Sequence, residues 1–296
     1  MIEVIPLKYG VTFKRVFSDP VIFSQFASDV LDMPIQVEQV HTEYEYPETV
    51  GYVKIKYDLF AEDTTQRTII EVQHIREDDF YDRFLYYHLI GLVEQVRGYT
   101  AYRFDRNVYT IVVLTSLPQE KRLQFSYAVS NMSPINEAGD QIQLYPHRLV
   151  FLGPRALNDQ TPPKVRPWLE LIADSLDSQV EESHYESDLF RQIIERMRRN
   201  TLSPEELSHI KDEAAWEEAR QNAVKEGLQQ GIEQGIEQGI EQGIEQGIEQ
   251  GIEQGIEQGQ QQTKRAIART MLDKGMDITL IISVTGLTQA EIEQLS

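Results

Sequence analysis

Two carboxylates stand on opposite arms of one predicted β-hairpin, in the segment KIKYDLFAEDTTQRTIIEVQ. If the hairpin turns at Thr64 and Thr65, Asp58 on its first strand lies directly opposite Glu71 on its second. Directly opposed residues have Cβ atoms roughly 5 Å apart. Two bare carboxylates repel each other at that separation, whereas together they suit one hard divalent cation. The pairing therefore predicts a cation-binding site.

Further polar side chains on these strands fit the hydrolysis of a phosphodiester. Strand alternation places Gln73 on the face of Glu71, and Lys54 and Lys56 on the face of Asp58. The reaction needs a metal that polarises the phosphate, a bound water of lowered pKa and a polar group that orients this water. We assign the last role to Gln73 and phosphate contacts to the two lysines. The structural alternatives are an amide that satisfies backbone groups and a solvated strand face.

Asp58 and Glu71 also have structural alternatives. Asp58 would be a turn aspartate paired with Arg67 or with a backbone amide. Glu71 stands in an apolar strand in which an unpaired carboxylate is costly, which favours a ligand role. His74 and His88 do not fall at a ligand spacing, so we interpret them as surface or core groups.

The elements that must position these residues form a small α/β domain in the order βββαβ. An amphipathic helical pair broken near Pro20 precedes three strands in a meander, which have β-branched and aromatic residues in near alternation. A helix and a buried strand follow, and then a fifth strand. The corresponding segments are residues 11–32, 37–73, 79–101, 107–117 and 141–153.

Beyond about residue 160 the strand signals stop, and three segments have helical patterns, residues 166–176, 188–199 and 203–226. In the last of these, Ser203 is an expected N-cap with Glu206 three residues later. This part of the chain is predicted to be a helical cover or arm.

Residues 231–258 are seven copies of Gly-Ile-Glu-Gln. In a straight helix a four-residue period moves the Ile column by roughly 40° per repeat, and right-handed winding around a partner would keep it in register. Each Gly costs about 1 kcal/mol relative to Ala, and each Glu faces another Glu four residues on. The segment is either a spacer of variable length or a helix that joins chains.

The end of the chain is predicted to form three short helices. Gly275 and Gly286 end the first two, Asp277 starts the second, and Thr288 with Glu291 starts the third. This pattern is typical of a small helix-turn-helix-like unit. The predicted domains are residues 1–158, 159–226, 227–262 and 263–296.

Composition narrows the class of protein. The chain has 296 residues, 41% of them hydrophobic, and no cysteine, which excludes disulfides and thiolate metal sites. Its net charge of −20 is spread along the chain, so no segment is a basic domain that coats nucleic acid. Without a leader-like N-terminus or a run of about 18 apolar residues, it is expected to be soluble and cytoplasmic, with no membrane contact.

The spacing of the candidate site resembles a known signature. Asp58, a twelve-residue gap and Glu71-Val72-Gln73 are similar to the PD-(D/E)xK nuclease motif, with Gln in place of Lys. Residues 13–17 (FKRVF), 83–87 (RFLYY) and 285–288 (TGLT) and the GIEQ array extend the similarity. Together they resemble the bacterial recombination-promoting nuclease and transposase family, most closely over residues 8–117.

This resemblance implies a restriction-endonuclease-like core, a central mixed sheet flanked by helices, that cuts DNA with Mg²⁺ or with Mn²⁺ in its place. Asp58 and Glu71 would bind the metal, the Val72 carbonyl would add a ligand, and Gln73 would stand for the catalytic Lys. The sequence departs from the family at Gln73 and at Gly10, where an acidic residue often precedes the Phe-Lys pair.

Arg83 and Tyr87 lie one helical turn apart and are candidates to line a DNA groove, although aromatics at this spacing also suit a core. We expect a magnesium-dependent DNA endonuclease that promotes recombination. A homodimer is expected because cutting both strands needs two sites. The alternatives are a nuclease fold without turnover that acts as an interaction module and, third, a strand-transfer enzyme.

Overall fold

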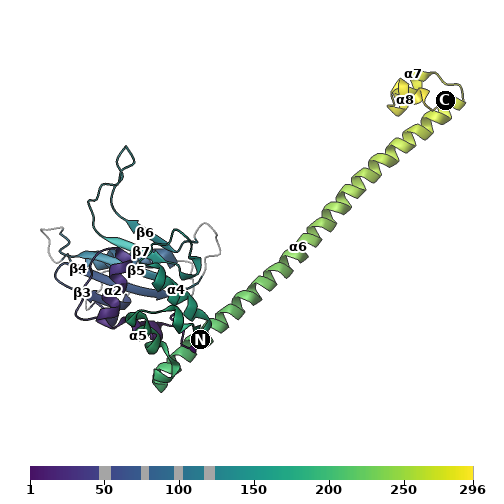
Figure 1. Ribbon diagram of the computed structural model, residues 1–296. Helices are drawn as coiled ribbons and strands as arrows, with labels where there is room; N and C mark the ends of the chain where they lie inside the picture. Colours follow the sequence, from purple (N-terminus) through teal and green to yellow (C-terminus); the bar gives the residue numbers. More distant parts are fainter. Residues whose placement is uncertain (47–54, 75–79, 97–102, 117–123, 296) are drawn as a thin grey trace. The chain divides into compact units, whose positions relative to one another are not determined.

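The computed structural model of the chain describes residues 1–46, 55–74, 80–96, 103–116 and 124–295 (Figure 1). It divides into two compact units, Met1–Glu217 and Glu218–Ser296. Helix α6 (Pro204–Asp273) begins in the first unit and continues through the second. The first unit is an α/β domain with a mixed central sheet flanked by helices, which confirms the predicted fold class.

The main sheet has six strands in the order β2-β3-β4-β5-β7-β6. The first three pair antiparallel, β5 pairs parallel with β4 and β7, and β6 pairs antiparallel with β7. The bounds are β2 (His41–Glu45), β3 (Lys56–Glu62), β4 (Gln66–Gln73), β5 (Asn107–Leu114), β6 (Tyr127–Asn131) and β7 (Arg148–Leu152). The meander and the strand that follows the helix are as predicted, while the edge strand β6 was not predicted.

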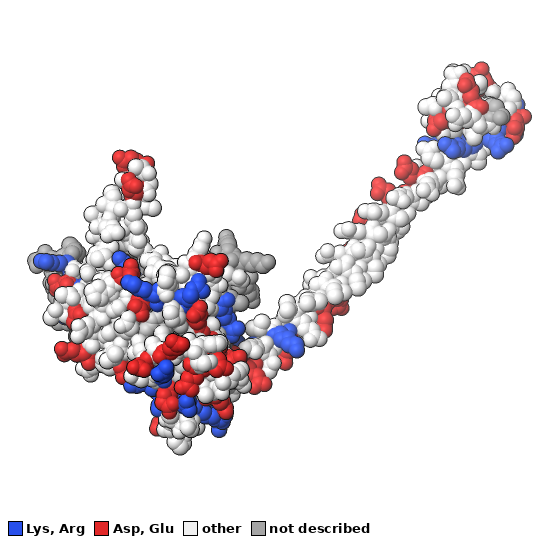
Figure 2. All heavy atoms as spheres, in the orientation of Figure 1, with Lys and Arg blue, Asp and Glu red and all other residues white. Residues whose placement is uncertain are grey.

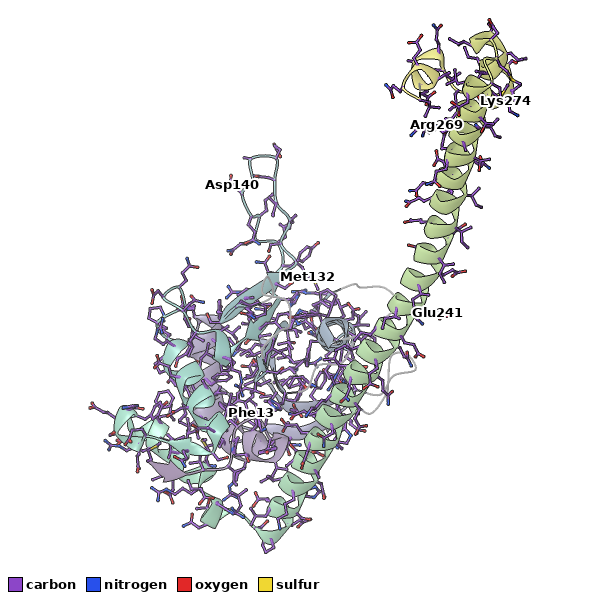
Figure 3. The ribbon with its side chains drawn as sticks, turned by 90° about the vertical axis from the view of Figure 1, so that its right-hand side faces the viewer. Phe13, Met132, Asp140, Glu241, Arg269 and Lys274 are labelled. Atoms are coloured by element: carbon purple, nitrogen blue, oxygen red, sulfur yellow. The ribbon has the colours of Figure 1, made fainter. Side chains whose placement is uncertain are left out.

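Helices cover both faces of this sheet (Figure 1). Helices α1 (Gly10–Phe17), α2 (Pro20–Leu31), α4 (Arg166–Asp174) and α5 (Asp188–Met197) form one apolar core with one face. Helix α3 (Phe80–Val93) forms a second core with the other face. Phe13, labelled in Figure 3, lies fully buried in the first core, and Phe84 is fully buried in the second. Strand β5 lies between the two cores, and its nearly continuous apolar sequence reflects this position.

Local signals set the ends of the helices. The Asp19 side chain accepts hydrogen bonds from the backbone N–H groups of Val21 and Ile22, and Pro20 opens α2, so the pair is broken where the sequence predicted. At the start of α6, Ser203 and Glu206 exchange backbone-to-side-chain hydrogen bonds of 2.7 and 3.1 Å. This is the predicted capping box.

The first unit also contains a two-stranded sheet. Strand β1 (Ile2–Glu3) pairs antiparallel with β8 (Gln179–Val180). The prediction that strands stop near residue 160 was wrong for β8, because a two-residue strand is too short to show alternation. The pairing brings the N-terminus to the helical region that follows the sheet.

In the second unit, the end of α6 packs with α7 (Ile278–Thr285) and α8 (Gln289–Glu293) around a small core of Ala268, Ile281, Leu287 and Ile292. Gly275 and Gly286 have positive φ angles of 72° and 67° where the first two helices end. Thr288 and Glu291 form a capping box. The second and third predicted helices are confirmed, whereas the first is not a separate short helix but the end of α6. The four predicted domains remain predictions, and the structure itself divides into two units.

The GIEQ repeats are helical throughout and lie within α6. Each of their isoleucines is 55–58% exposed. On the face that Figure 2 shows, the middle of α6 is mostly uncharged, although each repeat carries one Glu. Among the described residues, no helix is both long and apolar enough to cross a membrane.

Candidate active site

The hairpin of β3 and β4 has the predicted register. Leu59 pairs with Ile70 and Glu62 with Arg67, so one step further along the same register Asp58 lies opposite Glu71. Asp63 fixes the turn, because its Oδ1 accepts hydrogen bonds from the backbone N–H groups of Thr65 and Gln66 at 2.6 and 2.8 Å.

Where the paired strands end, at Leu59 and Ile70, hydrogen bonds to the two carboxylates replace the hydrogen bonds between the two backbones. The N–H of Asp58 donates to Oε1 of Glu71, and the N–H of Val72 donates to Oδ2 of Asp58, both at 3.0 Å. Each carboxylate is therefore held by the strand that carries the other. The alternative for Asp58, a contact with a backbone amide, is present, and it coexists with the predicted approach to Glu71.

Both acids lie where ionisation is costly. Glu71 is only 2% exposed, and burial together with the charge of Asp58 raises its pKa well above the ordinary value. Burial also raises the pKa of Asp58, against the lowering effects of the Val72 N–H, Lys14 and Arg83. Two desolvated acids that repel each other are an arrangement that a cation would stabilise.

The donor set fits a hard divalent cation. It consists of the carboxylates of Asp58 and Glu71, and oxygen is the ligand that Mg²⁺ prefers. A ligand role for the Val72 carbonyl stays a prediction. In the part of the chain that the structure describes, no three His, Asp or Glu side chains converge closely enough to hold one ion. The remaining ligands would be water, several of which Mg²⁺ ordinarily keeps.

Gln73 ends β4 and lines the same hollow as Asp58 and Val72, a pocket of about 270 Å³. Its backbone oxygen accepts a hydrogen bond from the N–H of Thr115 at 3.0 Å, which holds the strand end to β5. The structure thus brings together the three residues Asp58, Val72 and Gln73 at the pocket, with Glu71 buried beside Asp58.

The candidate phosphate contacts have different surroundings. Lys54 lies outside the described residues. Lys56 Nζ is 2.5 Å from Oε2 of Glu43, and Lys14 Nζ is 2.6 Å from Oε1 of the same carboxylate. These two cations lower the pKa of Glu43 to about 2, so its carboxylate remains ionised. Lys14 is the nearer of the two to the predicted site, because it also lines the pocket.

Arg83 and Tyr87, one turn apart on α3, contact each other. The Arg83 guanidinium lies 5.3 Å from the centre of the Tyr87 ring. Tyr87 is only 9% exposed and belongs to the second core, where its backbone oxygen accepts a hydrogen bond from the Tyr57 hydroxyl. Arg83 lowers the pKa of both Asp58 and Glu71, so its positive charge acts at the site.

The two histidines have structural partners. His88 is buried and its Nδ1 is 2.9 Å from the Thr110 hydroxyl; burial lowers its pKa to about 4. His74 bridges Thr115 and Glu217, with both nitrogen-to-oxygen distances 2.8 Å.

Helix α6 supplies residues that the sequence gave no reason to place here. Glu213 and Glu217 line the pocket together with Asp58. Glu217 Oε2 is 2.8 Å from Lys8 Nζ, and Glu213 accepts a hydrogen bond from the N–H of Gly10 at 3.0 Å. More than 140 residues separate Asp58 from these two acids, and no spacing pattern links them.

Comparison with known protein families shows to which family the chain belongs. A family model described as "PD-(D/E)XK nuclease family transposase" matches residues 8–227. The chain belongs to this family. A second model, "Rpn/YhgA-like nuclease family, C-terminal HTH domain", matches residues 261–296. No curated protein and no solved structure matches the chain significantly.

The PD-(D/E)XK match confirms the resemblance inferred from the motifs, and it extends past the sheet. It includes α4, α5 and the first turns of α6, which carry Glu213 and Glu217. The helix-turn-helix match covers the end of α6 with α7 and α8, the segment predicted to form such a unit.

Proposed function

We propose that this PD-(D/E)XK family protein is a magnesium-dependent DNA endonuclease that promotes recombination in the cytoplasm. The observation that carries the proposal is the pair Asp58 and Glu71. Each carboxylate accepts a hydrogen bond from a backbone N–H of the opposite strand, and Asp58 lines a pocket. A scaffold gains nothing from two adjacent acids whose pKa values are raised by burial, whereas a cation site requires such a pair.

In this proposal Asp58, Glu71 and the Val72 carbonyl hold Mg²⁺, or Mn²⁺ in its place. The bound cation supplies charge to polarise the phosphate and to lower the pKa of the attacking water. Gln73, at the end of the same strand, accepts a hydrogen bond from this water and orients it toward phosphorus. The hairpin fixes the Asp58 and Glu71 carboxylates before substrate arrives, which reduces the entropic cost of the reaction.

The positive charge that a lysine at position 73 would bring is provided from neighbouring elements. Lys14 on α1 and Arg83 on α3 both lower the pKa of Asp58 and Glu71, so both are close enough to stabilise negative charge there. This supports turnover despite the amide at position 73. Lys14 and Lys56 can contact phosphate once Glu43 releases them.

DNA contacts outside the site are assigned to the C-terminal unit. Figure 2 shows lysine and arginine gathered where the end of α6 meets the last helices, and Figure 3 labels Arg269 and Lys274 there. On the face of the first unit that Figure 2 shows, basic and acidic side chains are interspersed. We therefore expect moderate, strongly salt-dependent affinity for DNA.

Nicking of supercoiled plasmid tests the proposal. At low salt, purified protein with Mg²⁺ should nick the plasmid, while EDTA or Asp58→Ala should abolish nicking. Circular dichroism must show that the variant is folded. If folded wild-type protein is as inert as the variant with Mg²⁺ and with Mn²⁺, the nuclease assignment is wrong.

The second candidate is a nuclease fold without turnover that acts as an interaction module. Gln73 favours it, because the family name places a lysine at the end of the motif. In that case wild type and Asp58→Ala would bind DNA equally in a mobility-shift assay and neither would cut. Strand transfer is the third candidate, and joined plasmid products in the same assay would indicate it.

A further inference from the structure

Helix α6 carries a further carboxylate into the pocket of Asp58. The Glu213 side chain is half-buried and lines the pocket together with Asp58, Val72 and Gln73. Burial raises the pKa of Glu213, and the charge of Asp58 raises it further. The charge of Asp58 thus acts on the Glu213 carboxylate across the pocket that both line.

The Glu213 carboxylate occupies space that residue 10 leaves open. Its Oε2 accepts the Gly10 N–H at 3.0 Å, at the start of α1, where Tyr9 makes no side-chain cap. A Cβ added to Gly10 would lie 3.7 Å from Oε1 of Glu213, in ordinary van der Waals contact. A side chain at position 10 would therefore enter the volume that Glu213 fills from a distant part of the chain.

Contacts on both sides hold Glu213 in this place. Seven residues earlier on α6, Glu206 accepts hydrogen bonds from the Arg15 guanidinium at 2.8 and 3.0 Å. One turn later, Glu217 bridges Lys8 and His74, and His74 directly follows Gln73. These contacts tie α6 to α1 and to the end of β4, the two elements that flank the pocket. The backbone of Glu213 is fixed relative to Asp58 and Gln73.

The distance of Glu213 from Asp58 and Glu71 limits the role that its carboxylate can have toward the cation. Among the described residues no three acidic or histidine side chains are close enough to share one ion, so Glu213 is not a direct ligand beside Asp58 and Glu71. A carboxylate that faces the same pocket from further away suits the water molecules of a hydrated cation.

We propose that Glu213 is a positioning residue for the divalent cation: it accepts hydrogen bonds from cation-bound water and makes the start of α6 part of the active site. The inference rests on the proposed metal-dependent function. Position 10, where the family often has an acidic residue, is a glycine in this chain. In this inference Glu213 supplies the acidic group from α6 instead.

Mn²⁺ binding measured by titration calorimetry tests this without reference to cleavage. The variants are Glu213→Gln, Asp58→Ala and, as a matched control, Asp212→Asn on the exposed side of the same turn. Glu213→Gln keeps an oxygen for the Gly10 N–H, so its melting temperature in EDTA should be no lower than that of wild type. Its Mn²⁺ affinity should fall about tenfold or more, while Asp212→Asn should stay within about twofold of wild type, an effect small against that loss.

A second substitution separates positioning from packing. Gly10→Glu in the Glu213→Gln background returns a carboxylate to the pocket and should recover most of the lost affinity. Wild-type affinity in Glu213→Gln would overturn the inference alone, provided that Asp58→Ala no longer binds Mn²⁺. Wild-type protein that binds no Mn²⁺ would overturn both the inference and the proposed function.

Discussion

At the scale of single residues, the site departs from the family motif at Gln73, which stands in place of the motif's lysine. An amide can orient water through its oxygen, but it brings no positive charge to the developing phosphorane oxygens. Lys14 and Arg83 act on the same two carboxylates from other elements. Under the proposed function, the amide would therefore do only part of the work of a lysine, and Lys14 on α1 and Arg83 on α3 would supply the positive charge.

Replacing Gln73 tests this division. Gln73→Ala removes the water-orienting group and should lower the rate of plasmid nicking about 10²-fold, the usual loss for one preorganised polar contact. Gln73→Lys should at least preserve the rate, because the family residue combines both roles. Single-turnover nicking rates at saturating Mg²⁺ are the measurement. An inert Gln73→Lys beside an active wild type would show that the cations already present leave no room for another.

The raised pKa values of Glu71 and Asp58 predict how metal-free stability depends on pH. The native protein keeps protons on these acids at pH values where the unfolded chain has lost them. The free energy of unfolding therefore falls as the pH rises from the ordinary carboxyl range through the raised native values, and it stays lower above them.

Glu71→Gln should remove much of this penalty, since its oxygen can still accept the Asp58 N–H. In EDTA at pH 8 the variant should melt higher than wild type, by about 2–4 °C for each kcal/mol relieved, and at pH 4 the two should nearly coincide. Mg²⁺ should raise the melting temperature of wild type only. Thermal scans at both pH values provide the comparison, and a variant less stable than wild type at pH 8 would contradict it.

At the scale of elements, the edge strand β2 restrains two cations of the site. Glu43 has a positive φ of 54°, and its carboxylate lies between Lys14 of α1 and Lys56 of β3. A left-handed conformation is unfavourable for such a residue by roughly 1–2 kcal/mol, so neighbouring contacts must maintain it. The carboxylate occupies the position between two lysines that a phosphate would take.

Glu43→Gln should release both lysines for DNA. In a mobility-shift or anisotropy titration, affinity should rise several-fold at low salt, and the slope of log K against log salt should steepen by about 1–2. Glu38→Gln removes one charge from an exposed position and is the matched control. If both variants bind alike, the effect is one of net charge, and Glu43 does not restrain the lysines.

Parts of the fold and of the candidate site could be predicted from the sequence, and other parts could not. Asp58 and Glu71 lie on one hairpin, so turn position and alternation were enough to place them opposite each other. Strand β6 and the pair β1–β8 escaped prediction because edge and two-residue strands have little periodicity. Glu213 reaches the pocket from a remote helix, and Glu43 reaches Lys14 from a backbone with positive φ; neither leaves a pattern in the sequence.

At the scale of the molecule, α6 presents an unusual surface. Nine glycines at every fourth position from Gly227 to Gly259 lower its intrinsic helicity by about 1 kcal/mol each. Beside them runs the column of isoleucines, each more than half exposed. A helix of this composition needs burial of that column to be stable in water. We therefore favour the assembling helix over the spacer, with a second copy of the chain as the partner.

Truncation after Gln230 tests this choice, because it removes the repeats and the C-terminal unit but keeps every contact of α6 with the pocket. Light scattering should give an oligomer for the full chain and a monomer for residues 1–230. A second variant with all seven repeat isoleucines changed to Gln keeps the length and the C-terminal unit, and it should also be monomeric. If this variant keeps the mass of the full chain, the C-terminal unit and not the repeat joins the chains. If the full chain is itself monomeric, the repeat is a spacer, and cutting both DNA strands would need two separate encounters.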